Sequence, residues 1–127
     1  MLFYNIVMCG IIAILGYNCV FSYILQGLTM LQNRGYDSAG ICTLHENNNK
    51  NSSDKKLILN KYASNDQVSA LEKLQTHEQE QKDSTIGIGH TRWATHGPKT
   101  DLNSHPHYDH KEQLAVVHNG IIENFYE

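Results

Sequence analysis

Cys9 is the first residue of this sequence whose surroundings suggest chemistry. It stands in MCGIIAILG, residues 8–16, between a methionine and a glycine that leads into an apolar run. A thiol acts as a nucleophile only in its thiolate form, so a reactive cysteine needs a base within hydrogen-bond reach. Three interpretations are open: a buried thiol in an ordinary strand, an anchor point at a membrane, or a nucleophile that becomes the first residue of the mature protein.

The stretch GHTRWATHG, residues 89–97, could bind a carboxylate. Arg92 and Trp93 follow a predicted strand and precede a turn of small, hydrogen-bonding residues. A planar guanidinium and several backbone N–H groups could converge there on one carboxylate. Taken alone, the stretch fits a structural arginine and a core tryptophan equally well.

The tripeptide HNG, residues 118–120, offers two donors to a developing negative charge. The side-chain amide of Asn119 and the backbone N–H of Gly120 form a pair suited to stabilising an oxyanion. Glycine also permits the close approach of a ligand. Asn-Gly is equally the commonest hairpin turn, and RGYDSAG, residues 34–40, is by itself an ordinary glycine-containing turn.

The histidines raise the alternative of a metal-dependent hydrolase. Six of them lie between residues 90 and 118: His90, His96, His105, His107, His110 and His118. Catalytic zinc needs several protein ligands and an open position, often with a histidine pair on one helix as in H-E-x-x-H. Pro106 breaks any helix through HPHYDH, and no H-E-x-x-H pattern occurs. We therefore expect histidines at the surface or beside a site, and no metal.

The composition argues against several other classes of function. The chain has 127 residues, enough for one domain or part of one, and its 40% apolar and 18% charged residues fit a globular protein. With a net charge of −3 and no basic stripe, we expect neither a nucleic-acid nor a membrane partner. The 3 cysteines form no C-x-x-C pair, which argues against a disulfide framework and favours a reducing compartment, the cytoplasm.

The long uncharged start raises the question of a signal peptide or membrane anchor, because Arg34 is the first charged residue. A signal peptide needs a basic start and a small residue before its cleavage site, whereas here Met8 precedes Cys9. A spanning helix needs about 20 predominantly apolar residues, but asparagines, glycines, Ser22 and Gln26 interrupt this run. We therefore expect no membrane span.

The apolar pattern predicts the first elements that position these residues. Residues 9–15 form a continuous apolar run, which predicts a strand buried on both faces. Apolar residues then recur at steps of three and four from Val20 to Leu31, the period of an amphipathic helix. Asn18 is its predicted N-cap and Gly35 its predicted stop.

Further strands are predicted at residues 39–46, 56–62, 85–90 and 113–117. The polar tract 47–56 is a predicted loop. Ser64 and Gln67 resemble a capping box for a second helix with its own apolar stripe. This order of strands and helices predicts a mixed α/β or α+β layered fold.

Taken together and in order, the motifs resemble a known family. Class II (N-terminal nucleophile) glutamine amidotransferase domains, above all those of glutamine–fructose-6-phosphate aminotransferases, contain segments similar to MCGI, RGYDSAG, GHTRWATHG, NSHPH and VVHNGIIEN. The resemblance implies an α+β fold, the N-terminal part of a four-layer αββα sandwich of the Ntn-hydrolase type. It makes residues 9–127 a partial amidotransferase domain with 47–56 as a variable loop, and residues 1–8 an extension or a mis-assigned start.

The resemblance implies that Cys9 is the nucleophile. In the family this cysteine is the first residue of the mature chain, so its free α-amino group, with a reference pKa of about 7.7 to 8.0, can serve as the base. A seven-residue extension would turn that amine into an amide. We therefore expect Met8 to be the true start, followed by removal of the methionine.

The other site residues are implied in the same way. Asn119 and Gly120 would form the oxyanion hole, and Arg92 would hold the α-carboxylate of glutamine. The supporting residues would be Thr95 and His96 on the carboxylate side, Trp93 as a gate, Arg34 in the wall near the nucleophile, and His105 near an interdomain face.

The implied reaction is the hydrolysis of glutamine to glutamate and ammonia, without a metal or organic cofactor. In the family the ammonia serves glucosamine 6-phosphate synthesis, and fructose 6-phosphate would bind only through isomerase domains that are missing here. A full-length protein is expected to be a cytoplasmic homodimer. The alternatives are an inactive binding or regulatory fragment that keeps the motifs, a metal-dependent hydrolase, and a membrane-anchored small protein.

Overall fold

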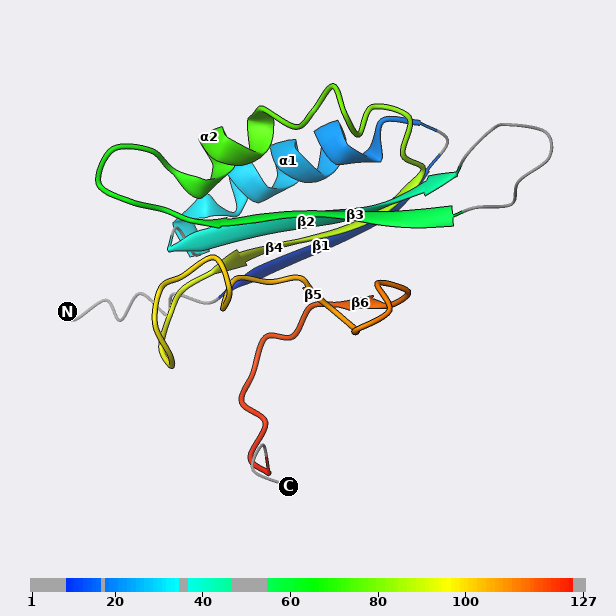
Figure 1. Cartoon of the computed structure of the whole chain (residues 1–127). Coiled ribbons are helices and arrows are strands. Elements are labelled where there is room, and N and C mark those ends of the chain that lie inside the picture. The colour runs from blue at the N-terminus through cyan, green and yellow to red at the C-terminus, as the bar shows by residue number, and fades with distance from the viewer. Residues whose placement is uncertain (1–8, 17, 35–36, 47–54, 125–127) are drawn as a thin grey trace.

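The computed structural model describes residues 9–16, 18–34, 37–46 and 55–124. Two helices lie on one side of a four-stranded sheet, and a two-stranded sheet lies on the other side (Figure 1). The elements follow in the order β1 (Gly10–Leu15), α1 (Val20–Met30), η1 (Gln32–Arg34), β2 (Ser38–Glu46), β3 (Lys55–Ala63), α2 (Ala70–Gln75), β4 (Ile86–Arg92), β5 (His107–Tyr108) and β6 (Ala115–Val116).

The four-stranded sheet places the cysteine and arginine motifs side by side. Its strand order is β1-β4-β2-β3, and each neighbouring pair is antiparallel. In the ladder between β1 and β4, Gly10 pairs with Thr91 and Leu15 pairs with Ile86. Cys9, which directly precedes β1, therefore lies at the same end of the sheet as Arg92, the last residue of β4.

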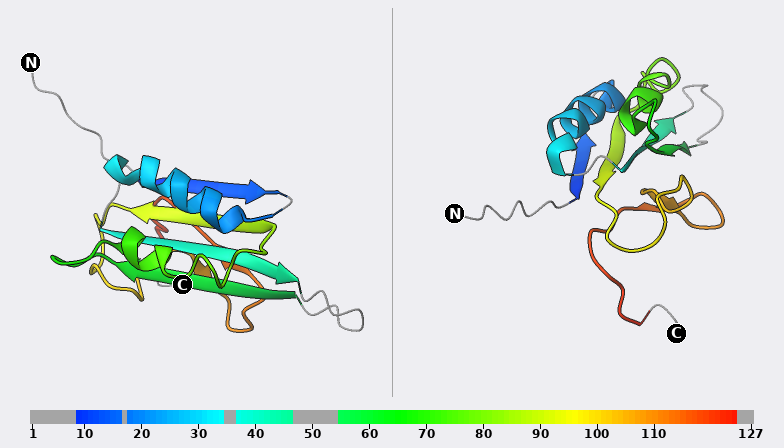
Figure 2. Two further views of the ribbon diagram at one scale, coloured as in Figure 1. Left: turned by 90° about the horizontal axis from the view of Figure 1, so that it is seen from above. Right: turned by 90° about the vertical axis from the view of Figure 1, so that its left-hand side faces the viewer.

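The helix face is the side of the sheet on which α1 and α2 pack, as both views in Figure 2 show. Successive side chains of a strand point to opposite faces, and Ile12 and Ile14 of β1 pack against the helical core. On β4 a Cβ at Gly89 would lie 2.4 Å from Cγ2 of Ile24, so only glycine lets α1 come this close. The buried core consists of Val20, Phe21, Ile24, Leu25, Leu28, Ala39, Ile41, Ala70 and Leu74.

The open face is the opposite side of the sheet, to which Ile11 and Leu15 of β1 and His90 of β4 point by the same alternation. In Figure 1, β5 and β6 lie on this open face and cover only part of it. Ile11 is 45% exposed and Leu15 is 80% exposed. The prediction of a strand buried on both faces is therefore wrong for β1, because the described helices cover only one side.

The predicted cap of the first helix is also wrong. The N-cap of α1 is Cys19 rather than Asn18, and no side chain caps the helix. Its first N–H groups find tertiary partners instead: the backbone N–H of Val20 donates to the carbonyl oxygen of Ser84 at 3.1 Å. The helix ends before the predicted stop at Gly35, which lies outside the described residues.

The second helix starts later than predicted. Its capping box is formed by Ser69 and Glu72, not by Ser64 and Gln67. The Ser69 hydroxyl accepts from the Glu72 N–H at 3.2 Å, and the Glu72 carboxylate accepts from the Ser69 N–H at 2.8 Å. The earlier segment forms a turn, because the Asn65 side chain accepts hydrogen bonds from the N–H groups two and three residues later.

The predicted strands at 39–46, 56–62 and 85–90 are confirmed as β2, β3 and β4 with small shifts of their ends. Only Ala115–Val116 of the predicted strand 113–117 is extended, and its partner β5 was not predicted.

The predicted α+β class is confirmed in its coarser form, a mixed α/β fold with an antiparallel sheet. The four-layer sandwich stays a prediction. Of the predicted loop 47–56, residues 47–54 lie outside the described residues, and Lys55 and Lys56 belong to β3. Within the described ranges, no helix is long and apolar enough to cross a membrane.

Candidate active site

A cavity of about 170 Å³ lies at the end of the sheet where β1 begins and β4 ends. Its walls come from three separate parts of the chain: the start of β1, the end of β4 with the loop that follows, and the segments around and after β5 and β6. The lining residues are Cys9, His90, Arg92, Trp93, Thr95, His96, His105, His118, Asn119, Gly120 and Ile121.

The sulfur of Cys9 is held against the backbone of Trp93. The Trp93 N–H donates to Sγ of Cys9 at 3.4 Å, and the thiol donates to the Trp93 carbonyl oxygen at 3.8 Å. Cys9 is half-buried and lines the cavity. The pairing of β1 with β4 thus fixes the nucleophile candidate beside the arginine motif.

The other cysteines have different surroundings. Cys42 on β2 is 2% exposed, and burial raises the pKa of its thiol to about 11, against a smaller opposing effect of the hydrogen bond with Tyr108. It is therefore a neutral thiol at physiological pH. Cys19 caps α1 and does not line this cavity. Cys9 is thus the cysteine that a ligand in the cavity would meet.

The guanidinium of Arg92 is surrounded by the loop that follows β4. Its Nη1 donates to the carbonyl oxygens of Pro98 at 3.2 Å and Asn103 at 3.3 Å, and its Nη2 donates to the carbonyl oxygen of His96. A guanidinium has five N–H donors, so a ligand carboxylate would meet the ones that these bonds leave. Arg92 thus stabilises the conformation of the loop and also places a positive charge in the cavity wall.

Asn119 and Gly120 reach the cavity from the segment after β6. Both residues are exposed, so their donors face solvent and the cavity space. The preceding N–H, that of His118, donates to Nδ1 of His105 at 3.4 Å. This bond ties the Asn-Gly segment to the histidines beneath the cavity.

Three histidines pack together beside the cavity. The ring centroids of His90 and His105 are 4.9 Å apart, and those of His105 and His107 are 4.5 Å apart. Burial, followed by the charge of neighbouring histidines, lowers the pKa of His90 and that of His105 to about 4. Burial and the nearby Lys61 also lower the pKa of His107. The cluster is therefore uncharged at neutral pH, whereas Arg92 places a permanent positive charge on the cavity wall.

Neither ring nitrogen of His90 has a hydrogen-bond partner among the described residues, although the side chain is 1% exposed. The same part of the chain contains no group of three or more histidine, cysteine, aspartate or glutamate residues that could hold a metal ion.

The structure brings nearly all predicted site residues to this one cavity. The exception is Arg34, the last residue of η1, whose side chain is not described. The roles of the other residues stay predictions, since a shared cavity does not assign chemistry. His90 and His118 also line the cavity and had no predicted role. Alternation along β4 could have indicated His90, because it stands two residues before Arg92 and so shares its face.

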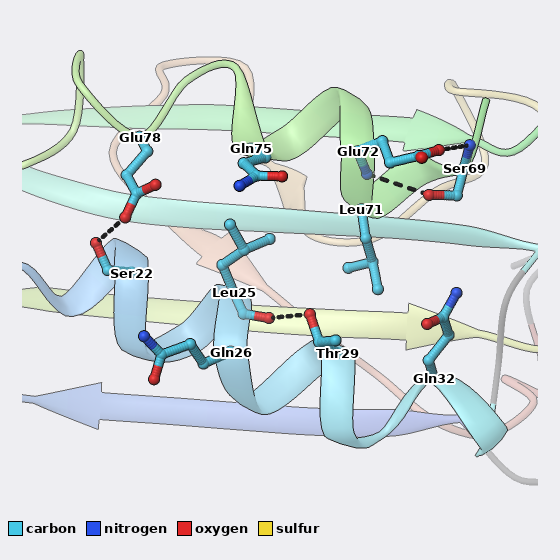
Figure 3. A pocket seen from close by; sticks show the side chains of 10 residues that line it. All are labelled: Ser22, Leu25, Gln26, Thr29, Gln32, Ser69, Leu71, Glu72, Gln75 and Glu78. Atoms are coloured by element: carbon cyan, nitrogen blue, oxygen red, sulfur yellow. Dashed lines mark hydrogen bonds between the residues drawn. The ribbon is translucent and has the colours of Figure 1, made fainter.

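A larger hollow of about 620 Å³ lies on the helix face, between α1 and α2 (Figure 3). Its floor includes Leu25 and Leu71, and its rim carries carboxamides, hydroxyls and the carboxylates of Glu72 and Glu78. Glu78 accepts a hydrogen bond from the hydroxyl of Ser22 at 2.6 Å. No cysteine or histidine lines it, so it offers neither a thiol nor an imidazole base.

The chain is similar to enzymes named glutamine–fructose-6-phosphate aminotransferase (isomerizing). It is 44% identical over 120 residues to that of Bacteroides thetaiotaomicron and 46% identical over 118 residues to that of Caldanaerobacter subterraneus, and each match covers 93% of this chain. The enzyme of Bartonella quintana is 47% identical over 120 residues, or 94% of this chain. No family model matches the chain.

The chain spans only 17% to 18% of the length of these relatives. It is homologous to their N-terminal part, the glutamine amidotransferase domain.

Proposed function

We propose that this homologue of the N-terminal part of glutamine–fructose-6-phosphate aminotransferases carries a glutaminase site in the cavity at Cys9. The thiolate of Cys9 attacks the side-chain amide carbon of glutamine, and a proton passes to the amide nitrogen, which leaves as ammonia. Water then attacks the resulting thioester, so that glutamate leaves and the thiol is restored. The step needs neither a redox partner nor a metal.

The observation that carries this proposal is the convergence on one cavity of a thiol, a guanidinium and an Asn-Gly segment. Cys9, Arg92 and Asn119 come from three separate parts of the chain and line the same 170 Å³ space. A cation facing that space suits the α-carboxylate of an amino acid. Thr95 and His96 extend the same wall, where Oγ1 of Thr95 and Nδ1 of His96 lie 3.0 Å apart.

Asn119 and Gly120 stabilise the oxyanion in this proposal. The amide of Asn119 and the N–H of Gly120 would donate to the carbonyl oxygen as it gains negative charge, in the way that preorganised donors lower an acyl-transfer barrier. Trp93, which lines the cavity, acts as a gate in this proposal, and His105 lies near an interdomain face of the longer protein. Arg34 would belong to the wall near the nucleophile.

The base in this proposal is the α-amino group of Cys9, which is free only when Cys9 is the first residue of the mature chain. A free α-amino group titrates at about 7.7 to 8.0 and is attached to the nucleophile itself. A chain that keeps residues 1–8 has an amide nitrogen there and lacks this base. Removal of a start methionine at position 8 would provide it.

The remaining expectations concern the longer protein and are part of the same proposal. The ammonia would be used to make glucosamine 6-phosphate from fructose 6-phosphate, the substrate in the relatives' names. Further domains would be needed for that step, in a cytoplasmic homodimer whose amidotransferase part is a four-layer αββα sandwich. The second candidate is a binding or regulatory fragment that keeps the cavity and holds an amino acid there without turnover.

The test is glutamate release from glutamine by a chain that begins at Cys9, with its N-terminus established by intact mass. We expect release that disappears in Cys9→Ala and persists in the matched control Cys19→Ala. A chain that begins at Met1 should be inactive. Absence of release from a folded chain that begins at Cys9 would favour the binding fragment.

A further inference from the structure

Asp37, which directly precedes β2, makes polar contacts with several separate segments. Its backbone N–H donates to the carbonyl oxygen of Arg92 at 3.1 Å, and its carbonyl oxygen accepts from the N–H of Ser64 at 2.9 Å. Its carboxylate accepts from the N–H of Ala94 at 2.8 Å and from Nζ of Lys99 at 2.6 Å. The side chain is 6% exposed.

These contacts enclose the peptide that touches the nucleophile. Asp37 holds the carbonyl of Arg92 on one side of Trp93 and the N–H of Ala94 on the other. Trp93 is the residue whose N–H and carbonyl both contact the sulfur of Cys9. A displacement of the segment 92–94 would therefore move the donor that faces the sulfur.

The contact with Lys99 secures the far end of the same loop. Lys99 follows Pro98, whose carbonyl oxygen accepts from Nη1 of Arg92. A buried carboxylate is stable only with strong partners, and a charge-assisted bond to an ammonium is one of them. Asp37 thus joins both ends of the segment 94–99 to the start of β2, and this segment carries Thr95 and His96 of the cavity wall.

We propose that Asp37, paired with Lys99, is a positioning residue that holds the segment 93–99 in register with Cys9 and Arg92. The pair acts through the loop and does not touch the substrate. The expected effect on glutamine binding rests on the proposed glutaminase function. Whether the Asp37–Lys99 pair holds the segment 93–99 in place can be measured without turnover. Loss of a purely structural contact would lower the fraction of folded protein, whereas loss of a positioning contact would raise the KM for glutamine of the folded protein.

Lys99→Gln is the variant that separates these roles. The Lys99 side chain is 58% exposed, so its replacement removes the charge without opening the core. We expect faster hydrogen exchange at the Ala94 N–H and a KM for glutamine raised about fivefold, with kcat changed less, since the Lys99 end of the pair is exposed to solvent and its charge is partly screened. Lys99→Arg should restore both values, and Lys82→Gln, an exposed lysine elsewhere, should change neither.

Asp37→Asn is the stronger variant, because it removes the charge at the buried end of the pair. We expect KM to rise about tenfold or more, in keeping with hydrogen bonds to charged groups. In the Asp37→Asn background, Lys99→Gln should add little, since both changes break the same contact.

The outcomes separate this inference from the proposed function. If the unsubstituted chain that begins at Cys9 hydrolyses glutamine and Lys99→Gln leaves KM unchanged, the positioning role is wrong. If the unsubstituted chain that begins at Cys9 does not hydrolyse glutamine, the proposed function fails, and hydrogen exchange at the Ala94 N–H alone then decides whether the Asp37–Lys99 pair holds the segment. Faster exchange in both variants supports it, and unchanged exchange overturns it.

Discussion

The two faces of the four-stranded sheet use the same strands for opposite purposes. On the helix face, glycines of β4 make room for α1, and a closed cluster of apolar side chains excludes water. On the open face, His90 and Arg92 of β4 and Cys9, just before β1, border a cavity instead of a helix. Period-two alternation lets one short strand serve packing on one side and chemistry on the other.

Because one face holds the apolar core and the other borders the cavity, stability and activity should respond to different substitutions. The side chain of Ile24 is fully buried against β4, whereas Asn119 is exposed and projects from an irregular segment. Core residues contribute mainly by the apolar surface they bury. Exposed donors at a cavity contribute mainly when charge develops in a bound substrate.

Ile24→Ala should have the largest effect on stability. Deleting a fully buried isoleucine side chain leaves a cavity, and we expect a loss of about 2–5 kcal/mol in the free energy of unfolding. The matched control is Leu15→Ala on the open face, where the side chain is 80% exposed and the loss should be small. Denaturant unfolding measures both, and equal losses would contradict the asymmetry of the two faces.

Asn119→Ala should lower activity strongly while leaving stability almost unchanged. Loss of one oxyanion donor typically lowers kcat by about 10²–10³-fold, equivalent to about 2.7–4 kcal/mol of barrier. Asn18→Ala, which removes another exposed asparagine, should leave kcat intact because that residue does not line the cavity. Steady-state kinetics and thermal melting on the same samples would show whether the two effects separate as expected.

The histidine cluster should make the open face sensitive to acid. His90 has a pKa of about 4 in the fold, below its usual value of 6.5, so the unfolded chain binds this proton first as pH falls. Stability should therefore be lost between pH 6.5 and about 4, by about 3 kcal/mol for this group, and should not depend on its charge above pH 6.5.

The check is unfolding of His90→Gln compared with the unsubstituted chain at several pH values. Glutamine does not titrate, so the loss of stability between pH 6.5 and 5 should become shallower whatever the effect of the substitution at neutral pH. His105 has a similarly low pKa and provides a second variant for the same comparison. Parallel pH curves for all three chains would contradict the account.

Ser69→Ala should have the smallest effect and concerns the helix face. It removes the capping box of α2, and the expected loss is about 1 kcal/mol in the free energy of unfolding. The N-cap of α1 makes no side-chain hydrogen bond, so Cys19→Ala should cost much less. Thermal melts of the two variants compare a helix capped by side chains with one held by tertiary bonds.

The helix face was the part of the fold that the sequence predicted best. The apolar period of α1 and the strands β2, β3 and β4 follow from local patterns that packing preserves. The caps were mispredicted because competing turns and tertiary bonds decide them: Asn65 forms its own turn, and Ser84 satisfies the start of α1. The one-sided burial of β1 depends on which layers cover the sheet, and periodicity alone does not report that.

The cavity was predictable as a set of motifs but not as a network. Cys9, Arg92 and Asn119 stand out by residue type and by the segments around them. The tie between Asp37 and Lys99 joins positions that are 62 residues apart, so no local pattern could indicate it. The hydrogen bonds from Arg92 to the carbonyl oxygens of Pro98 and Asn103 likewise depend on the three-dimensional path of the loop, which the sequence pattern does not give.

The most direct test of the central claim is the site of covalent labelling by a glutamine analogue that carries a diazoketone in place of the side-chain amide. A thiol that attacks this group forms a thioether with loss of nitrogen gas, and peptide mass spectrometry locates the adduct. The account predicts a single adduct on Cys9, slowed by excess L-glutamine and not by D-glutamine. Labelling that L-glutamine does not slow, or that falls equally on Cys19, would contradict it.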